Sequence, residues 1–247
     1  MERTITYFDK IGRENTEATL AIAKKRADEL GIKTILVAST IGDTAARAVD
    51  VFKGCKVVAV GHAYGFREAN KNEFTDENRK AFESKGGILY FAPHSMIGLT
   101  RRPTPPAAPG TPPAPLPPGP ILDIGDVIAN TLRILCAGIK VVVECGCMAA
   151  DAGLVRTDED IIAIAGSGRG ADTAVVMRAA NNRDMFRTRI TEILCKPLVY
   201  AGGPPPGAGA PGAAAGAPMG AGAPAGATQV GGGAPAPASA TQVRRPA

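Results

Sequence analysis

"GIKTILVASTIGDTAARAVDVFKG", residues 31–54, reads as a buried strand, a turn and a helix in that order. Residues 34–39 are a continuous apolar run, which is typical of strands buried on both faces of a parallel sheet. Residues 42–54 then read as a helix, and residues 56–61, KVVAVG, as the next strand. Two buried strands joined by a helix predict an α/β fold, with a parallel or mixed sheet covered by helices.

The same alternation of strand and helix extends to both sides of this stretch. The remaining predicted elements are a strand at 4–8, helices at 15–31 and 75–87, a strand at 88–92, a helix at 123–138, a strand at 140–145, a short helix at 146–154, strands at 160–166 and 173–180, and a closing helix at 183–197. Ligands of such sheets collect at the carboxyl ends of the strands, near a switch in strand order. We therefore expect the functional residues in the turns that follow the strands.

Two segments of the 247-residue chain differ in composition from the rest. Residues 100–120 are dominated by proline, and residues 201–247 consist almost entirely of glycine, alanine and proline. Neither segment can bury enough apolar surface to offset the entropy lost on ordering. The sequence thus predicts one domain over 1–200, interrupted by a proline-rich insert at 100–120, and a disordered tail at 201–247.

The charge pattern does not favour nucleic-acid binding. The net charge is +5 and the pI about 9.0, but acidic and basic residues are interspersed, tryptophan is absent and aromatic residues make up 4%. A nucleic-acid interface usually shows a basic patch with aromatic residues. No apolar run is long enough for a membrane span, and the N-terminus lacks the apolar stretch of a signal peptide. We expect a cytoplasmic protein that binds neither nucleic acid nor membranes.

The cysteines do not indicate a disulfide framework or a metal site. Their number, five, is odd, and their neighbours are apolar. Cys145 and Cys147 are separated by one residue, which is the wrong spacing for a CxxC redox or zinc pair. We expect small buried thiols and no metal.

Four stretches together resemble a known family. They are "IGRENTEATLAIAKKRADELGIKTILVASTIGDTAARAVDVF", "NRKAFESKGG", "MAADAGL" and "IAIAGSGRGADTAVV". Over most of residues 5–198 the chain resembles the stand-alone relatives of the pyruvate kinase C-terminal domain. The resemblance implies a three-layer α/β/α fold with a mixed sheet. It does not imply pyruvate kinase activity, because the catalytic barrel of that enzyme has no place in this chain. Flavin mononucleotide (FMN) has been seen in some members and is implied as a candidate ligand, and a homo-oligomer is implied by analogy.

The turn at residues 38–45, ASTIGDTA, is the first candidate for binding a phosphate. The start of a helix presents unpaired amides and the positive end of its dipole. Hydroxyl groups add donors, and the resemblance implies that the matching turn of pyruvate kinases holds an effector phosphate. The predicted contacts are Ser39, Thr40, Gly42 and Thr44. The alternative is that Asp43 or Thr44 only caps the helix.

The glycine-rich turn at 166–173, GSGRGADT, is the second candidate. It is not a dinucleotide-binding fingerprint, because a strand follows it where that motif needs a helix. A glycine-rich turn can still form a nest of amides for an anion, and an arginine adds a charged fork. The predicted contacts are Gly166, Ser167, Gly168, Arg169 and Gly170. The alternative is a plain turn between strands, with Arg169 in solvent.

Three further residues are expected at the same edge. His62 and His94 each follow a strand, and Glu144 ends the predicted strand at 140–145. The histidines could donate hydrogen bonds or transfer protons, and Glu144 could bind a sugar or ribityl hydroxyl. The alternatives are surface histidines and a helix-capping glutamate. The three residues come from separate loops without the local spacing of a metal site.

These features predict a binding domain for a small molecule that carries a phosphate, such as FMN or a sugar phosphate. One alternative is an enzyme of unknown reaction on a phosphorylated metabolite, with His62 or His94 as acid or base. A second alternative is an interaction module that uses its proline-rich segments. The fold alone cannot choose among them, because function depends on the site.

Overall fold

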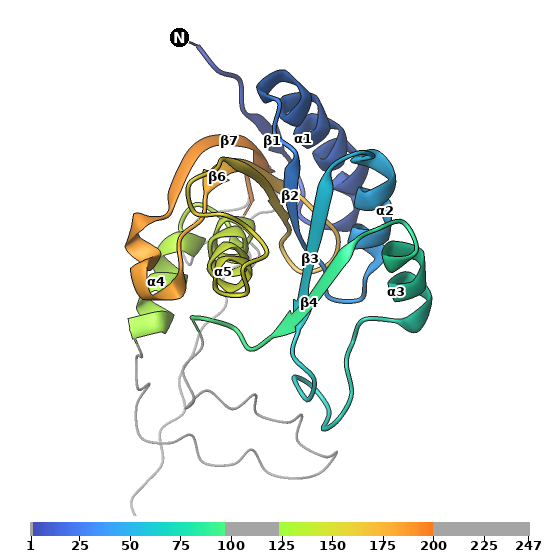
Figure 1. The fold of residues 1–247 in the computed structure, drawn as a ribbon. Helices are drawn as coiled ribbons and strands as arrows, with labels where there is room; N and C mark the ends of the chain where they lie inside the picture. Colours follow the sequence, from blue (N-terminus) through green and yellow to red (C-terminus); the bar gives the residue numbers. More distant parts are fainter. Residues whose placement is uncertain (1, 97–123, 200–247) are drawn as a thin grey trace, which may run out of the picture. The chain divides into compact units, whose positions relative to one another are not determined.

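The computed structural model describes residues 2–96 and 124–199 (Figure 1). The predicted proline-rich insert at 100–120 and the predicted tail at 201–247 lie outside the described residues. No helix in these two described ranges is both long and apolar enough to cross a membrane.

The described elements alternate between strands and helices through most of the chain. In chain order they are β1 (Thr6–Phe8), η1 (Arg13–Asn15), α1 (Thr16–Leu30), β2 (Thr34–Ala38), α2 (Asp43–Val51), β3 (Lys56–His62), α3 (Asp76–Glu83), β4 (Ile88–Ala92), α4 (Ile124–Arg133), α5 (Ala137–Asp151), β5 (Ile161–Ala165), β6 (Thr173–Arg178), η2 (Asn182–Arg187) and β7 (Arg189–Pro197).

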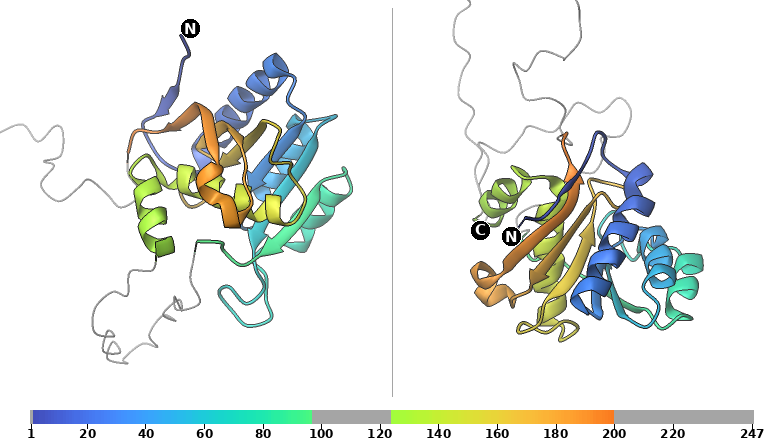
Figure 2. Two further views of the ribbon diagram at one scale, coloured as in Figure 1. Left: turned by 60° about the vertical axis from the view of Figure 1, so that its left-hand side comes forward. Right: turned by 90° about the horizontal axis from the view of Figure 1, so that it is seen from above.

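The strands of the described ranges form one seven-stranded sheet in the order β1-β7-β6-β5-β2-β3-β4. All neighbouring pairs are parallel except β5–β6 and β6–β7, so β6 alone runs against the others. Helices α1, α2 and α3 cover one face, and α4 and α5 cover the other (Figures 1 and 2). The predicted fold class, a three-layer α/β/α fold with a mostly parallel mixed sheet, is confirmed.

Strand β2 shows why its sequence is apolar throughout. Ile35 and Val37 pack into the core under α1 and α2, while Leu36 points to the opposite face and packs in the core beside α5. All three side chains are buried. A strand covered on both faces has no solvent side, so it shows no alternation of polar and apolar residues.

The strand order changes direction between β2 and β5. From β2 the chain passes through α2, β3 and α3 to β4, moving toward one edge of the sheet. It then continues through α4 and α5 on the other face and returns as β5, directly beside β2. The carboxyl ends of β2 and β5 therefore lie side by side where the chain leaves toward opposite edges of the sheet, which is the usual place of a ligand site in this class of fold.

The strand predicted at 140–145 is wrong, since these residues belong to helix α5. The short helix predicted at 146–154 is largely the second half of the same helix. Helix α5 is buried over most of its circumference, so its sequence lacks the polar face by which a surface helix is recognised. The spacing of Lys140 and Glu144, four residues apart, was the available signal for a helix.

The closing helix predicted at 183–197 is also wrong. Residues Asn182–Arg187 form the short 3-10 helix η2, and Arg189–Pro197 form β7. Strand β7 pairs in parallel with β1 and antiparallel with β6, so both of its edges are hydrogen-bonded within the sheet. These long-range pairings override a local apolar spacing that also suits a helix.

Candidate functional site

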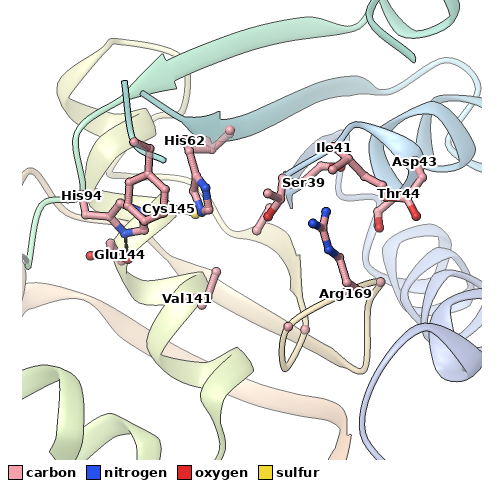
Figure 3. A pocket seen from close by; sticks show the side chains of 18 of the residues that line it. Ser39, Ile41, Asp43, Thr44, His62, His94, Val141, Glu144, Cys145 and Arg169 are labelled. Atoms are coloured by element: carbon pink, nitrogen blue, oxygen red, sulfur yellow. Dashed lines mark hydrogen bonds and ion pairs between the residues drawn. The ribbon is translucent and has the colours of Figure 1, made fainter. Parts of the chain in front are cut away.

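A cavity of about 440 Å³ lies at the carboxyl edge of the sheet, at the β2–β5 switch point (Figure 3). Its walls come from the turn after β2, the ends of β3 and β4, the β5–β6 turn and one side of α5. The predicted site residues that line it are Ser39, Thr40, Thr44, His62, His94, Glu144, Gly166, Gly168, Arg169 and Gly170. The sheet thus gathers residues that are up to 131 positions apart in the sequence, although their contact with a ligand stays a prediction.

Gly42 and Ser167 are the predicted residues that do not line the cavity. Gly42 precedes α2 with φ of 95°, a conformation that favours glycine. A Cβ atom on Gly42 would lie 2.4 Å from Cε1 of Phe74 and 2.6 Å from Cβ of Asn78. Gly42 therefore sets the path of the backbone into α2 and lets the chain pack closely against Phe74.

The first turn of α2 faces the cavity with free amides. Ser39 Oγ accepts a hydrogen bond from the amide of Ala45 at 3.3 Å, and the carboxylate of Asp43 pairs with Arg13 at 2.9 Å. Asp43 therefore does not cap the helix. Within the described ranges the amides of Asp43 and Thr44 have no hydrogen-bond acceptor. These donors and the positive end of the helix dipole lie at this wall of the cavity, beside the Arg13–Asp43 ion pair.

The β5–β6 turn is held by the buried carboxylate of Asp172. Its Oδ2 atom accepts from the amides of Gly12 and Ser167, both at 3.0 Å, and its Oδ1 atom accepts from Thr173 Oγ1 at 2.9 Å. The hydroxyl of Ser167 also faces this carboxylate, at 3.5 Å. These contacts explain why Ser167 is turned away from the cavity.

Arg169 projects from this turn into the cavity (Figure 3). The turn packs against the start of α1, where the amide of Ala171 donates to Thr16 Oγ1 at 3.0 Å. Gly170 has φ of 75°, and a Cβ atom there would lie 2.5 Å from Cα of Arg13. The close packing therefore requires glycine at 170 and fixes the base of Arg169, whose side chain remains 50% exposed.

His62, the last residue of β3, forms a pair with Glu73 from the following loop. Its Nδ1 atom lies 2.6 Å from Glu73 Oε2, and Glu73 Oε1 accepts from Arg67 at 2.8 Å. Burial lowers the pKa of His62 below 6.5; the hydrogen bond with Glu73 opposes part of this shift, and nearby His94 adds to it. His62 is therefore neutral at physiological pH.

His94, just after β4, forms a second such pair with Glu144. Its Nδ1 atom lies 2.9 Å from Glu144 Oε2, while Glu144 Oε1 accepts from the amide of Met96 at 3.2 Å. Lys140 also pairs with Glu144. Burial alone would raise the pKa of Glu144, but the hydrogen bond with His94 and the charge of Lys140 lower it to about 2. Glu144 reaches the site from α5 and not from the end of a strand, which corrects the sequence prediction.

The two imidazoles and Phe66 form a cluster of rings at one side of the cavity. The ring centroids of His62 and His94 are 5.1 Å apart, and Phe66 lies 4.0 Å from His62 and 5.1 Å from His94. Val141 and Met148 add apolar surface from α5. This side of the cavity suits the carbon skeleton or ring of a ligand.

The site contains groups that the sequence did not reveal. Glu73, Arg67 and Lys140 orient or neutralise the predicted residues, and no local motif marks Glu73 or Arg67. Among the described residues, no three His, Cys, Asp or Glu side chains are arranged to hold a metal ion. Burial raises the pKa of Cys145, which also lines the cavity, to about 12, so its thiol is protonated and a poor nucleophile.

Comparisons with known proteins give distant matches. No protein-family model matches the sequence. Among solved structures, the chain is similar to a pyruvate kinase from Cryptosporidium parvum, with 14% identity and a TM-score of 0.31, over 65% of this chain and 22% of that one. A pyruvate kinase from the same organism in complex with ADP matches with 14% identity and a TM-score of 0.32, over 67% of this chain and 24% of that one. The chain thus spans about a quarter of the length of these pyruvate kinases. Its fold class follows from its own strand order. Membership in the stand-alone family stays a prediction.

Proposed function

We propose that the cavity binds a small molecule that carries a phosphate group, and that the chain acts as a binding domain for it. The observation that carries this proposal is the meeting of two positive elements, the first turn of α2 and Arg169, at one cavity. They come from turns more than 100 residues apart in the sequence. A site that brings helix amides and a guanidinium together is suited to a phosphate.

The charge of Arg169 is available to a ligand. Its nearest acidic partner among the described residues is Glu73, at 4.0 Å from Nη2. Glu73 is already hydrogen-bonded to His62 and Arg67 at shorter distances. By contrast, Arg13 is engaged by Asp43. Among the described residues, Arg169 is thus the cation at this edge with the longest ion-pair distance.

The size and walls of the cavity favour a metabolite over a lone phosphate ion. Its volume of about 440 Å³ falls in the range of small-molecule sites. Beyond the positive wall lie Phe66, the two imidazoles and the apolar side of α5. FMN and sugar phosphates both combine a phosphate with a body that could occupy this space.

The test is a calorimetric titration of the full chain with FMN, riboflavin and inorganic phosphate. FMN should bind, and riboflavin, which lacks the phosphate, should bind at least about tenfold more weakly. Arg169→Gln should weaken FMN binding by about tenfold. Arg178→Gln is the matched control, because Arg178 has the same 50% exposure and one ion pair, with Asp160, away from the cavity. If no phosphate-bearing probe binds at about 100 μM, the proposal is wrong.

The histidine–carboxylate pairs favour one second candidate, an enzyme that acts on the same phosphorylated molecule. An imidazole oriented by a carboxylate is a common general base. Consumption of a phosphorylated metabolite by the wild type, lost in His94→Gln with binding retained, would support this candidate. Binding without any turnover favours the binding domain.

A further inference from the structure

Both imidazoles at the cavity use the same ring atom toward a carboxylate. His62 Nδ1 lies 2.6 Å from Glu73 Oε2, and His94 Nδ1 lies 2.9 Å from Glu144 Oε2. An ionised carboxylate can only accept hydrogen bonds, so each Nδ1 must carry the hydrogen. In a neutral ring the other nitrogen, Nε2, is then a hydrogen-bond acceptor.

The surrounding charges keep the two carboxylates ionised. The pKa values of Glu73 and Glu144 are both lowered despite burial, with the partner histidine as the main cause, Arg67 assisting at Glu73 and Lys140 at Glu144. Arg169 lies 4.0 Å from Glu73 as well. The two rings are 5.1 Å apart, so a proton on one imidazole disfavours a proton on the other. The lowered pKa of His62 makes a neutral ring its favoured state near pH 8.

The cavity therefore has two chemically different sides. In Figure 3 the imidazoles lie at one side and Asp43 and Thr44, at the start of α2, lie at the other, with Ser39 and Arg169 between them. Helix amides and a guanidinium donate hydrogen bonds, whereas Nε2 of a neutral imidazole that carries its hydrogen on Nδ1 accepts them. A ligand that bridges the cavity must match both sides.

We propose that the ligand is a phosphomonoester with hydroxyl groups at the end remote from its phosphate, and not a phosphorylated acid. The phosphate lies against α2 and Arg169, and the hydroxyl groups donate to the imidazoles of His62 and His94. A carboxylate at that end would face two acceptor atoms and would need at least one ring to be protonated. This inference rests on the proposed function, since it assumes that the phosphate is bound at the positive side.

The experiment compares glycerol 3-phosphate with 3-phosphoglycerate, which differ only in a hydroxymethyl group in place of a carboxylate. Calorimetric titrations of the full chain at pH 8 should show glycerol 3-phosphate binding about tenfold more tightly, as one or two neutral hydrogen bonds are worth about threefold to tenfold in affinity each. His62→Phe/His94→Phe should bring this ratio close to one. Arg169→Gln should weaken both probes about equally and leave the ratio unchanged.

The outcomes separate the inference from the proposed function. If neither probe nor inorganic phosphate binds, both the proposed function and the inference are wrong. If both probes bind and 3-phosphoglycerate binds at least as tightly, or if the ratio survives in the double histidine variant, only the inference is overturned.

Nitrogen-15 NMR of the wild-type imidazoles gives a readout that needs no variant. Both rings should show a hydrogen on Nδ1 and a bare Nε2 at pH 8. A hydrogen on Nε2 of either ring would overturn the inference even if the double variant fails to fold.

Discussion

Lys140 and Glu144 form an ion pair one helical turn apart on α5, and both side chains are buried, with exposures of 4% and 1%. Glu144 also accepts hydrogen bonds from His94 and from the amide of Met96. The pair therefore links the helix to the end of β4. Glu144 holds His94 at the cavity, and the charge of Glu144 is itself compensated by buried Lys140.

Breaking this pair should destabilise the fold strongly. Glu144→Gln leaves the ammonium group of Lys140 buried without its partner, so the free energy of unfolding should fall by about 3–5 kcal/mol at pH 7. In Lys140→Met/Glu144→Gln, the uncompensated charge is gone, and much of that loss should be recovered. Urea denaturation followed by circular dichroism measures both values. Equal losses in the single and double variants would show that the ion pair is not the cause.

Glu144 should also make the free energy of unfolding depend on pH. The pKa of Glu144 is about 2 in the folded protein and 4.5 ordinarily, so the unfolded chain binds the proton more readily. The stabilisation is present above pH 4.5 and is lost as the pH falls from about 4.5 to 2, by roughly 2–3 kcal/mol. Urea denaturation at several pH values should show this decline in the wild type. Lys140→Met/Glu144→Gln is the control, and a decline of the same size in it would contradict the assignment to Glu144.

Gly42→Ala should cost more than a substitution at an unhindered glycine. A methyl group at 42 meets Phe74 and Asn78 and also has an unfavourable backbone angle. The expected loss is about 2–4 kcal/mol, with weaker phosphate binding because the first turn of α2 must shift. Gly31→Ala is matched in having φ of 68° but nothing within 4 Å, and should cost only about 1 kcal/mol. Thermal unfolding and phosphate titration of the two variants provide the comparison.

Asp172→Asn tests the support of the β5–β6 turn. Two backbone amides and two hydroxyls point at this carboxylate, so a side-chain amide would bring a donor toward donors. We expect a loss of about 1–3 kcal/mol and weaker binding of FMN, since Arg169 is carried by the same turn. Asp158→Asn, at an exposed ion pair with Arg156, should leave stability almost unchanged. Unchanged affinity for FMN in Asp172→Asn would show that the support of this turn by Asp172 does not affect binding of the ligand.

The thiols should differ in reactivity in the native protein. Cys55 is partly exposed, whereas Cys136, Cys145, Cys147 and Cys195 are buried. Burial also raises the pKa of Cys147 and Cys195 to about 11 each. Brief alkylation with iodoacetamide at pH 8, followed by mass spectrometry, should modify Cys55 first and the others only after unfolding. Rapid modification of Cys145 would show that the cavity wall is more open than the structure has it.

The sheet was predictable where each strand is covered by the helices next to it in sequence. Residues 34–39 and 56–61 have apolar side chains on both faces, and in a repeated βα fold this pattern indicates strands that are covered on both sides. Helix α5 was missed because a helix buried nearly all round carries the same continuous apolar run as a buried strand. Strand β7 was missed because its pairing partners, β1 and β6, are not signalled in its own residues.

The site was predictable to the extent that strand ends define it. Ser39, His62 and Gly166 reach the cavity because parallel strands finish at one edge. Glu144 reaches it for a different reason, as a side chain on a helix that crosses behind the sheet. Ser167 does not reach it, because Asp172 holds its hydroxyl and amide. Contacts of this kind depend on three-dimensional packing and leave no trace in residue spacing.

Strand β6 is reversed between β5 and β7, so the segment bearing Arg169 leaves and re-enters the sheet at the paired residues Ala165 and Thr173. Gly170 and Asp172 hold this segment against the rest of the fold, whereas Gly168 and Arg169 make none of these contacts. An exchange confined to positions 168 and 169 would change the wall of the cavity without changing any strand pairing. Ligand choice in this architecture could then change through two residues at the tip of one turn.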